Sequence, residues 1–266
     1  MSSVPPQPQQ TIGVCPPARG ALLAQLVQQS DAPVSLIVCA DLKVAEQLTE
    51  DTRLFNLEAG GKMPEPEILV LPESMPTNAD MREAFAASAD RTAVLSRLQA
   101  TRKVKKRTGK SPALVVLTDP TALVQPVPAI DAFVSHEFTI KTGAEVGFKD
   151  LLEKLHALDY DSEPLCESPG HYAVRGGLID IYPVTANEPY RLDFFGDELE
   201  EIRSFDPVTQ RSGAAISSIT LSASPRLKLE VARTGLAAYL SPQTQLILVE
   251  PSTLETAFSQ LAERSE

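Results

Sequence analysis

The sequence is poor in the residues that build disulfide-stapled or metal-bound folds. It has three cysteines and three histidines in 266 residues, and both sets are widely scattered. Cys15, Cys39 and Cys166 form neither a disulfide framework nor a closely spaced pair of metal ligands. The composition therefore predicts no metal site. It also fits a reducing compartment, so we expect a cytoplasmic protein.

Aromatic residues are scarce as well. Tryptophan is absent, and the first of the five tyrosines is Tyr160. Proteins that stack on exposed nucleobases need aromatic platforms. The first half of the chain is therefore poorly equipped to inspect bases.

Positive charge and long apolar runs are also limited. The chain carries 24 basic and 35 acidic residues, a net charge of −11, which argues against bulk attraction to DNA or to an anionic membrane. No apolar run is long enough to span a bilayer. The first residues are rich in proline and glutamine and lack the basic and apolar regions of a signal peptide. We expect residues 1–11 to be a disordered lead-in.

Residues 12–127 alternate short apolar runs with helical patterns. The runs at 34–39 and 113–117 are typical of strands that are buried on both faces of a parallel sheet. Asp41 and the pair Asp119-Pro120 are typical helix starts. The alternation predicts βαβ units, and therefore an α/β domain with a parallel sheet.

A proline-rich stretch, residues 124–128, interrupts this pattern and predicts a boundary. Residues 128–222 then combine an amphipathic helix at 147–156 with several β-rich segments, which predicts an α+β domain.

The βα pattern resumes after about residue 223. It has an apolar run at 246–249 and a capping-box pattern, Ser252 with Glu255, ahead of an apparent helix. We predict that residues 223–266 return to the first sheet, so that the middle domain is an insertion.

The most distinctive pattern lies within residues 169–212. Aromatic and β-branched runs at 172–182, 190–195 and 198–205 are bounded by glycine, proline and aspartate, which is typical of an antiparallel meander. Strand alternation divides the middle run into two faces. Tyr190, Leu192 and Phe194 form an apolar face, whereas Arg191, Asp193 and Phe195 form a mixed one.

The mixed face allows two interpretations. Arginine and aromatic residues together are favoured at the centres of protein interfaces. Alternatively, Phe195 folds under a neighbouring element while Arg191 and Asp193 pair on the surface, because single exposed apolar residues are common. The pattern alone leaves both open.

Three motifs follow one another in this region. They read Ala-Val-Arg-Gly-Gly-Leu-Ile-Asp-Ile-Tyr-Pro, then Tyr-Arg-Leu-Asp-Phe-Phe-Gly-Asp-Glu, then Phe-Asp-Pro-x-Thr-Gln-Arg-Ser. The series resembles the UvrA-binding module that is shared by the excinuclease protein UvrB and the bacterial transcription-repair coupling factor (Mfd). The resemblance implies a non-catalytic module of nucleotide excision repair that binds the excinuclease protein UvrA. The implied docking residues are Arg175, Arg191 and Phe195.

The resemblance has further implications for organisation. It implies a degenerate, helicase-like first domain with an inserted interaction domain. In the complete family protein, RNA polymerase and DNA are engaged by regions outside these 266 residues. We expect alanine at Arg175, Arg191 or Phe195 to weaken partner binding while leaving folding unchanged, with Arg175 on a strand that neighbours the other two.

A glycine-containing loop stands where such a domain would hold nucleotide. Set against GxxxxGK[ST], Gly13 matches, but Ala18, Arg19 and Gly20 replace the second glycine, the lysine and the hydroxyl residue. The replacements remove the flexible phosphate-wrapping position, the compact cation and the magnesium ligand. We predict an inactive loop, no ATP or other cofactor, and no enzymatic activity.

One basic cluster occupies the stretch before the run at 113–117. It could contact phosphates, which would make the chain a nucleic-acid-binding module. We prefer a solvated loop, because no aromatic residue is interleaved and the rest of the chain is acidic. Its residues are Arg102, Lys103, Lys105, Lys106, Arg107 and Lys110.

Overall fold

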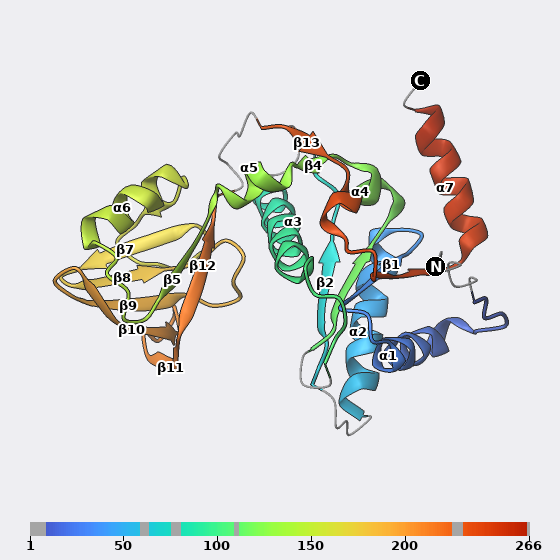
Figure 1. Cartoon of the computed structure of the whole chain (residues 1–266), viewed down its shortest axis with the longest axis horizontal. Helices are drawn as coiled ribbons and strands as arrows, with labels where there is room; N and C mark the ends of the chain where they lie inside the picture. The colour runs from blue at the N-terminus through green and yellow to red at the C-terminus, as the bar shows by residue number, and fades with distance from the viewer. Residues whose placement is uncertain (1–8, 59–63, 76–80, 109–111, 225–230, 265–266) are drawn as a thin grey trace, which may run out of the picture. The chain divides into compact units, whose positions relative to one another are not determined.

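The chain forms two compact units, which are coloured along the sequence in Figure 1. The computed structural model describes residues 9–58, 64–75, 81–108, 112–224 and 231–264. The first unit comprises Met1–Val70, Val104–Thr118 and Gln243–Glu266. The second comprises Leu71–Lys103 and Asp119–Pro242.

The first unit is built on a four-stranded sheet with the order β14-β1-β3-β2. The central strand β1 runs parallel to both of its neighbours, β3 and β14. Every residue of β1 and β3 is buried, as expected for apolar strands inside a parallel sheet. The predicted α/β fold with a parallel sheet is confirmed. The strands are β1 (Val34–Val38), β2 (Glu67–Leu71), β3 (Leu114–Thr118) and β14 (Gln245–Leu248).

Helices α1 (Arg19–Gln29) and α2 (Leu42–Glu58) pack on each other and on this sheet. A Cβ atom added to Gly20 would lie 2.5 Å from Cβ of Asp51, so glycine permits the close approach of the two helices. Asp41 accepts a hydrogen bond from the Val44 amide at 2.8 Å, which confirms its predicted helix start. A short 3₁₀ turn, η1 (Pro16–Ala18), precedes α1.

The predicted capping box at the last helix is wrong. Helix α7 (Pro251–Glu263) begins with Pro251 in its first turn, one position before Ser252. Proline fixes the backbone angle that a helix start requires, so it sets the start here. Glu250 precedes it with a left-handed φ of 55°, and no side chain caps the helix.

The second unit contains one long helix, two strand pairs and a six-stranded sheet of order β11-β10-β9-β8-β7-β6. Strand β5 pairs with β12, and β4 pairs with β13. Among the described residues, no helix combines the length and apolar character needed to cross a bilayer. The elements are α3 (Met81–Thr101), α4 (Pro120–Val124), β4 (Val127–Pro128), α5 (Ile130–Val134), β5 (Glu137–Lys141), α6 (Phe148–Ala157), β6 (Asp161–Ser162), β7 (His171–Arg175), β8 (Leu178–Ile181), β9 (Tyr190–Phe195), β10 (Glu198–Phe205), β11 (Ser212–Ile216), β12 (Ser218–Ser222), β13 (Arg233–Thr234) and η2 (Leu236–Tyr239).

Helix α6 covers one face of the six-stranded sheet, here called the inner face (Figure 1). Leu151 and Leu155 on the helix are fully buried with Leu192 on β9, which confirms the predicted amphipathic helix. Phe148 packs edge-on against Phe194, with ring centroids 5.3 Å apart. The predicted apolar face of β9 is therefore the core face.

The predicted strand at 172–182 is instead two strands, β7 and β8, joined by Gly176 and Gly177. Gly176 has φ of +63°, a left-handed conformation that suits glycine at a tight hairpin turn. A Cβ atom on Gly177 would lie 2.8 Å from the Phe194 carbonyl oxygen. The two glycines thus break the run into a hairpin, and β8 separates β7 from β9. The prediction that the strand of Arg175 neighbours that of Arg191 and Phe195 is therefore wrong.

Candidate protein-interaction surface

The opposite face of the six-stranded sheet, here called the outer face, carries all three predicted docking residues. Strand register places Arg175 opposite Leu178, and Leu178 opposite Asp193. Asp180 lies opposite Arg191, and Arg191 lies opposite Arg203. Because cross-strand partners share a face, Arg175 and Arg191 point to the same side as Phe195.

Phe195 is the anchor of this face. Its side chain is 76% exposed, although the ring of the preceding residue, Phe194, is buried. It pairs with Glu198 across a two-residue turn in which Gly196 has φ of +63°. Asp197 in that turn accepts a hydrogen bond from the Phe148 amide at 3.1 Å, which ties the turn to the start of α6. The exposed ring is therefore held on a rigid hairpin.

Arg175 stands on the same side, at the end of β7. It is exposed, and its guanidinium donates a long hydrogen bond of 3.5 Å to the Pro164 carbonyl. Strands lie about 4.8 Å apart and residues two positions apart are about 6.8 Å apart along a strand. With β8 between them, the Cα atoms of Arg175 and Phe195 are roughly 12 Å apart. We call Arg175, Asp193 and Phe195 the open half of the outer face.

Arg191 differs from the prediction. Its guanidinium makes two hydrogen bonds to the Asp180 carboxylate, at 2.7 and 2.8 Å, and donates to the Gln210 carbonyl at 3.4 Å. It also lies over the Phe205 ring, 4.8 Å from the centroid. The side chain is 18% exposed, and that of Asp180 only 2%. Arg191 is thus not a second open cation beside Phe195, and its ion-pair partner is Asp180 rather than Asp193.

A small apolar cluster surrounds this pair. Cys166, Ala173 and Phe205 are buried together, with Tyr182 against them. The Cys166 thiol donates to the His171 carbonyl at 3.3 Å. Burial, reinforced by the negative charge of nearby Asp180, raises the pKa of the Cys166 thiol to about 12. We call Asp180, Arg191, Phe205 and Cys166 the closed half of the outer face.

The turn after β10 adjoins the closed half. Asp206 accepts hydrogen bonds from the amides of Val208 and Thr209, at 2.9 and 2.7 Å. These amide bonds, that of Thr209 first, lower the pKa of the Asp206 carboxyl. Gln210 adopts a left-handed φ of 59° and presents its carbonyl to Arg191. Arg191 therefore also holds this turn in place.

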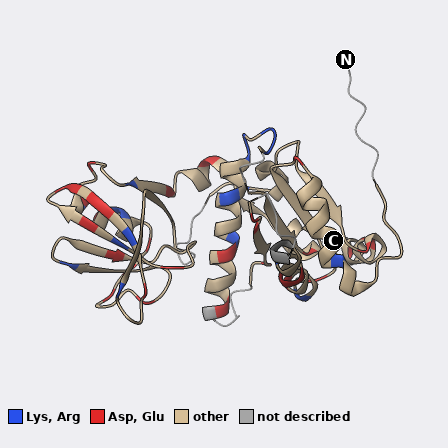
Figure 2. Cartoon of the chain, turned by 90° about the horizontal axis from the view of Figure 1, so that it is seen from below, with Lys and Arg blue, Asp and Glu red and all other residues tan. Residues whose placement is uncertain are grey.

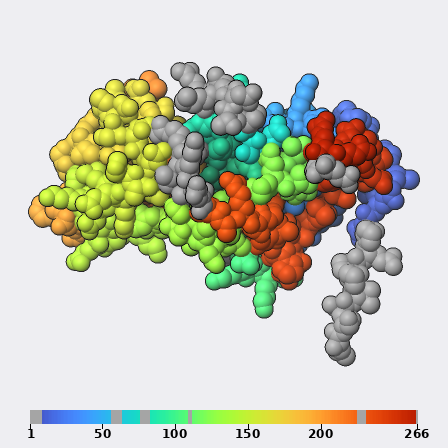
Figure 3. All heavy atoms as spheres, turned by 90° about the horizontal axis from the view of Figure 1, so that it is seen from above, coloured from blue at the N-terminus to red at the C-terminus, as the bar shows by residue number. Residues whose placement is uncertain are grey.

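The outer face mixes charges of both signs. Arg203 pairs with Glu201 at 2.6 Å, and Asp193 is exposed beside them. Figure 2 shows acidic and basic residues interspersed along the strands of this sheet. In Figure 3, residues from the yellow part of the chain, which includes β7 and β8, lie at the surface on the face drawn. The arrangement suits recognition of a protein surface more than attraction to a polyanion.

The residues of the glycine-containing loop lie in different structural elements and make different contacts. Gly13 has φ of +75° in an exposed segment, and Ala18 ends the 3₁₀ turn before α1. Arg19, in the predicted lysine position, forms an ion pair with Glu250. Gly20 is buried against α2. Glu250 was not anticipated, because 231 residues separate it from Arg19.

The residues of the basic cluster lie in different environments. Arg102, Lys103 and Lys105 are exposed, and Lys106 forms an ion pair with Asp31 at 2.9 Å. Arg107 is buried and donates to the carbonyls of Val27 and Ser30, at 3.0 and 2.6 Å, at the end of α1. The prediction that Arg107 is a solvated side chain is wrong, because it caps that helix end. Lys110 lies outside the described residues.

No group of three or more potential metal-ligating side chains gathers within the described ranges. The three cysteines, all within the described ranges, form no disulfide, and two of them, Cys39 and Cys166, are buried. We therefore propose no metal site.

Residues 138–226 match the family model described as the UvrB interaction domain. The chain is also 32% identical over 213 residues to the transcription-repair-coupling factor of Myxococcus xanthus, which covers 79% of the chain. It is 27% identical over 238 residues to that of Bacillus subtilis, which covers 86% of the chain. The chain belongs to the transcription-repair-coupling factor family and corresponds to an N-terminal module of it.

The chain spans less than a fifth of the length of these relatives, 17% and 19% respectively. The UvrB interaction domain, which is non-catalytic, contains the whole meander from β7 to β11. The open and closed halves of the outer face therefore both belong to this domain.

Proposed function

We propose that the chain is a non-catalytic protein-interaction module of bacterial transcription-coupled nucleotide excision repair, and that its open half docks the excinuclease protein UvrA. The observation that carries the proposal is Phe195, a 76% exposed ring on the outer face of the UvrB interaction domain, beside exposed Arg175. An exposed aromatic anchor with a nearby arginine is typical of an interface centre.

The open half defines the chemistry of the partner surface. Phe195 requires a shallow apolar pocket, and Arg175 requires a carboxylate roughly 12 Å from it. Asp193 and Glu198 lie close to Phe195 in the sheet, so the rim of the pocket should carry cations. A partner with only acidic residues around the pocket would be rejected by these carboxylates.

Arg191 contributes to docking as a positioning residue. Its guanidinium is occupied by Asp180, the Gln210 carbonyl and the Phe205 ring. It therefore links β9 to β8 and holds the turn after β10 in position. Arg175 and Phe195 make the contacts with the partner.

The first unit is proposed to be a degenerate helicase-like domain whose sequence is interrupted by an inserted interaction domain. Pairing of β14 with β1 supports a return of the chain to the first sheet from Gln243 onward, whereas residues 231–242 belong to the second unit. The ion pair of Arg19 with Glu250 and the burial of Gly20 support a loop that binds no ATP. RNA polymerase and DNA would be engaged by other regions of a full-length protein, in the bacterial cytoplasm.

Calorimetric titration of UvrA into the chain tests the docking proposal. We expect Phe195→Ala to weaken binding by about 30-fold, which corresponds to about 2 kcal/mol, and Arg175→Ala by about 10-fold. Leu246→Ala on β14 is the matched control, because Leu246 is also a large apolar side chain with 59% exposure. It should bind as the parent does. Equal affinities for the parent, Phe195→Ala and Arg175→Ala would refute docking at the open half.

A nucleic-acid-binding function is a second candidate, because Arg102, Lys103 and Lys105 are exposed. Changing all three to glutamate should abolish any weak binding to a duplex oligonucleotide at low salt. The same variant should keep its affinity for UvrA. Loss of that affinity would move the docking site to the basic cluster.

A further inference from the structure

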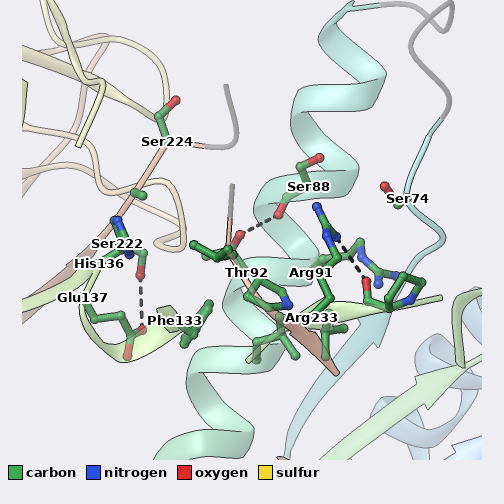
Figure 4. A pocket seen from close by; sticks show the side chains of 16 residues that line it. Ser74, Ser88, Arg91, Thr92, Phe133, His136, Glu137, Ser222, Ser224 and Arg233 are labelled. Atoms are coloured by element: carbon green, nitrogen blue, oxygen red, sulfur yellow. Dashed lines mark hydrogen bonds between the residues drawn. The ribbon is translucent and has the colours of Figure 1, made fainter. Parts of the chain in front are cut away.

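A cavity of about 380 Å³ lies in the second unit, apart from the outer face. Its walls come from α3, from β4 and β13, and from the ends of β5 and β12 (Figure 4). The volume is within the range of sites that hold small organic molecules. Leu95, Val127 and Phe133 give it an apolar wall, and serine and threonine hydroxyls complete it.

Arg91 on α3 supplies the first cation of this cavity. The residue is only 8% exposed, and its guanidinium donates to the Pro72 carbonyl at 2.7 Å. A guanidinium has five N–H donors. Among the described residues, no carboxylate forms an ion pair with it. A buried arginine with spare donors facing a cavity is suited to hold an anion.

Arg233 on β13 supplies the second cation. It donates to the Pro126 carbonyl at 3.4 Å, a contact drawn in Figure 4, and within the described ranges it too has no ion-pair partner. Burial, followed by the positive charge of Arg233, lowers the pKa of Arg91, while Asp119 offsets part of this effect. Both arginines line the same cavity, so an anion bound there would neutralise two positive charges.

Among the described residues that line the cavity, the only carboxylate is that of Glu137, and it lies on the opposite wall. Glu137 accepts a hydrogen bond from the Ser222 hydroxyl at 3.3 Å (Figure 4). His136 lies in the turn after α5, and its Nδ1 is 2.8 Å from the Ala132 carbonyl oxygen of that helix. Neither group competes for the two arginines.

We propose that this cavity binds a small organic anion, with a phosphate or carboxylate group held by Arg91 and Arg233 and the rest of the molecule packed on Leu95 and Phe133. This site would give the second unit a second binding function, separate from the docking surface. Glu137 and Ser222 are paired across β5 and β12. The chain enters the UvrB interaction domain next to Glu137, and most of that domain precedes Ser222. The anion would therefore bind at the base of that domain and stabilise the second unit.

Thermal unfolding of the full chain tests the site with four probes: inorganic phosphate, pyrophosphate, citrate and AMP. Sodium chloride at matched ionic strength is the reference. We expect at least one probe, at about 10 mM, to raise the Tm by about 2–4 °C over that reference. Comparison of the phosphate-bearing probes with citrate distinguishes binding of a phosphate group from binding of a carboxylate group.

Arg233→Gln should weaken binding of the stabilising probe at least 10-fold, because it removes one of the two cations. Arg91→Met should do the same. If Arg91→Met fails to fold, Arg233→Gln, at an exposed position, still decides the outcome. Arg211→Gln is the matched control, since it removes the same charge at an exposed position outside the cavity and should leave binding unchanged. The proposal is wrong if no probe stabilises the chain beyond sodium chloride, or if Arg233→Gln and Arg211→Gln bind the probe equally well.

Discussion

The two halves of the outer face place the same residue type in opposite situations. Arg191 lies opposite Asp180, a carboxylate that is 2% exposed, and its donors are used within the fold. Arg175 lies opposite Leu178, which offers it no charge, and it remains exposed. What faces an arginine across the sheet therefore decides whether it stabilises the domain or is available to a partner.

The largest effect on stability is expected when the ion pair of the closed half is broken. Arg191→Ala should lower the free energy of unfolding by about 3 kcal/mol or more, because it leaves the Asp180 carboxylate buried without a cation. Urea denaturation followed by circular dichroism measures this. The sequence alone led us to expect that alanine at Arg191 leaves folding unchanged, and the ion pair with Asp180 reverses that expectation.

A double substitution sharpens the test. Asp180→Leu combined with Arg191→Met replaces the ion pair by apolar side chains and should recover most of the loss. If Arg191→Ala proved as stable as the parent, Arg191 would not be structural and the division into two halves would fail.

The hairpin that supports Arg175 should be the next most sensitive feature. Gly177→Ala places a Cβ atom 2.8 Å from the Phe194 carbonyl oxygen, which is backbone and cannot rotate away. We expect a loss of about 2 kcal/mol in the free energy of unfolding. Gly176→Ala is the neighbouring control: its Cβ meets nothing within 4 Å, so only the left-handed φ counts against it, at about 1 kcal/mol. A reversed order of the two variants would contradict the close approach of β7–β8 to β9.

The smallest effects on stability are expected in the open half. Phe195→Ala and Arg175→Ala should each change the free energy of unfolding by no more than about 0.5 kcal/mol, because both side chains already face solvent. The same urea experiment applies. A loss of 2 kcal/mol in either variant would make that residue part of the core and would remove it from the proposed interface.

Much of the fold follows from local patterns. The mainly apolar runs at 34–39 and 113–117 predicted the buried strands β1 and β3, and strand alternation predicted that Leu192 and Phe194 face the core. The same alternation placed Arg191 and Phe195 together on the other face. It could not decide between an exposed and a covered Phe195, because alternation says nothing about what lies over a face.

The partners of the arginines were not predictable in the same way. Asp180 could have been placed opposite Arg191 only if Gly176 and Gly177 had been interpreted as a hairpin turn, since that turn and the next set the register. Arg107 looked like one more cation in a basic run. Its burial depends on the carbonyls of Val27 and Ser30, which are about eighty residues earlier in the chain.

Because β14 pairs with β1, the first sheet can be completed only after most of the chain has been synthesised. Ser35 and Gln245 are partners in that ladder and are 210 positions apart. At about 5–20 residues per second, a ribosome needs roughly 10–40 seconds to deliver β14 after β1. During that interval the entire second unit is already synthesised, while one edge of β1, an apolar strand, has no neighbour. An unpaired apolar edge recruits strands from other chains, so the nascent protein should depend on chaperones until β14 is synthesised.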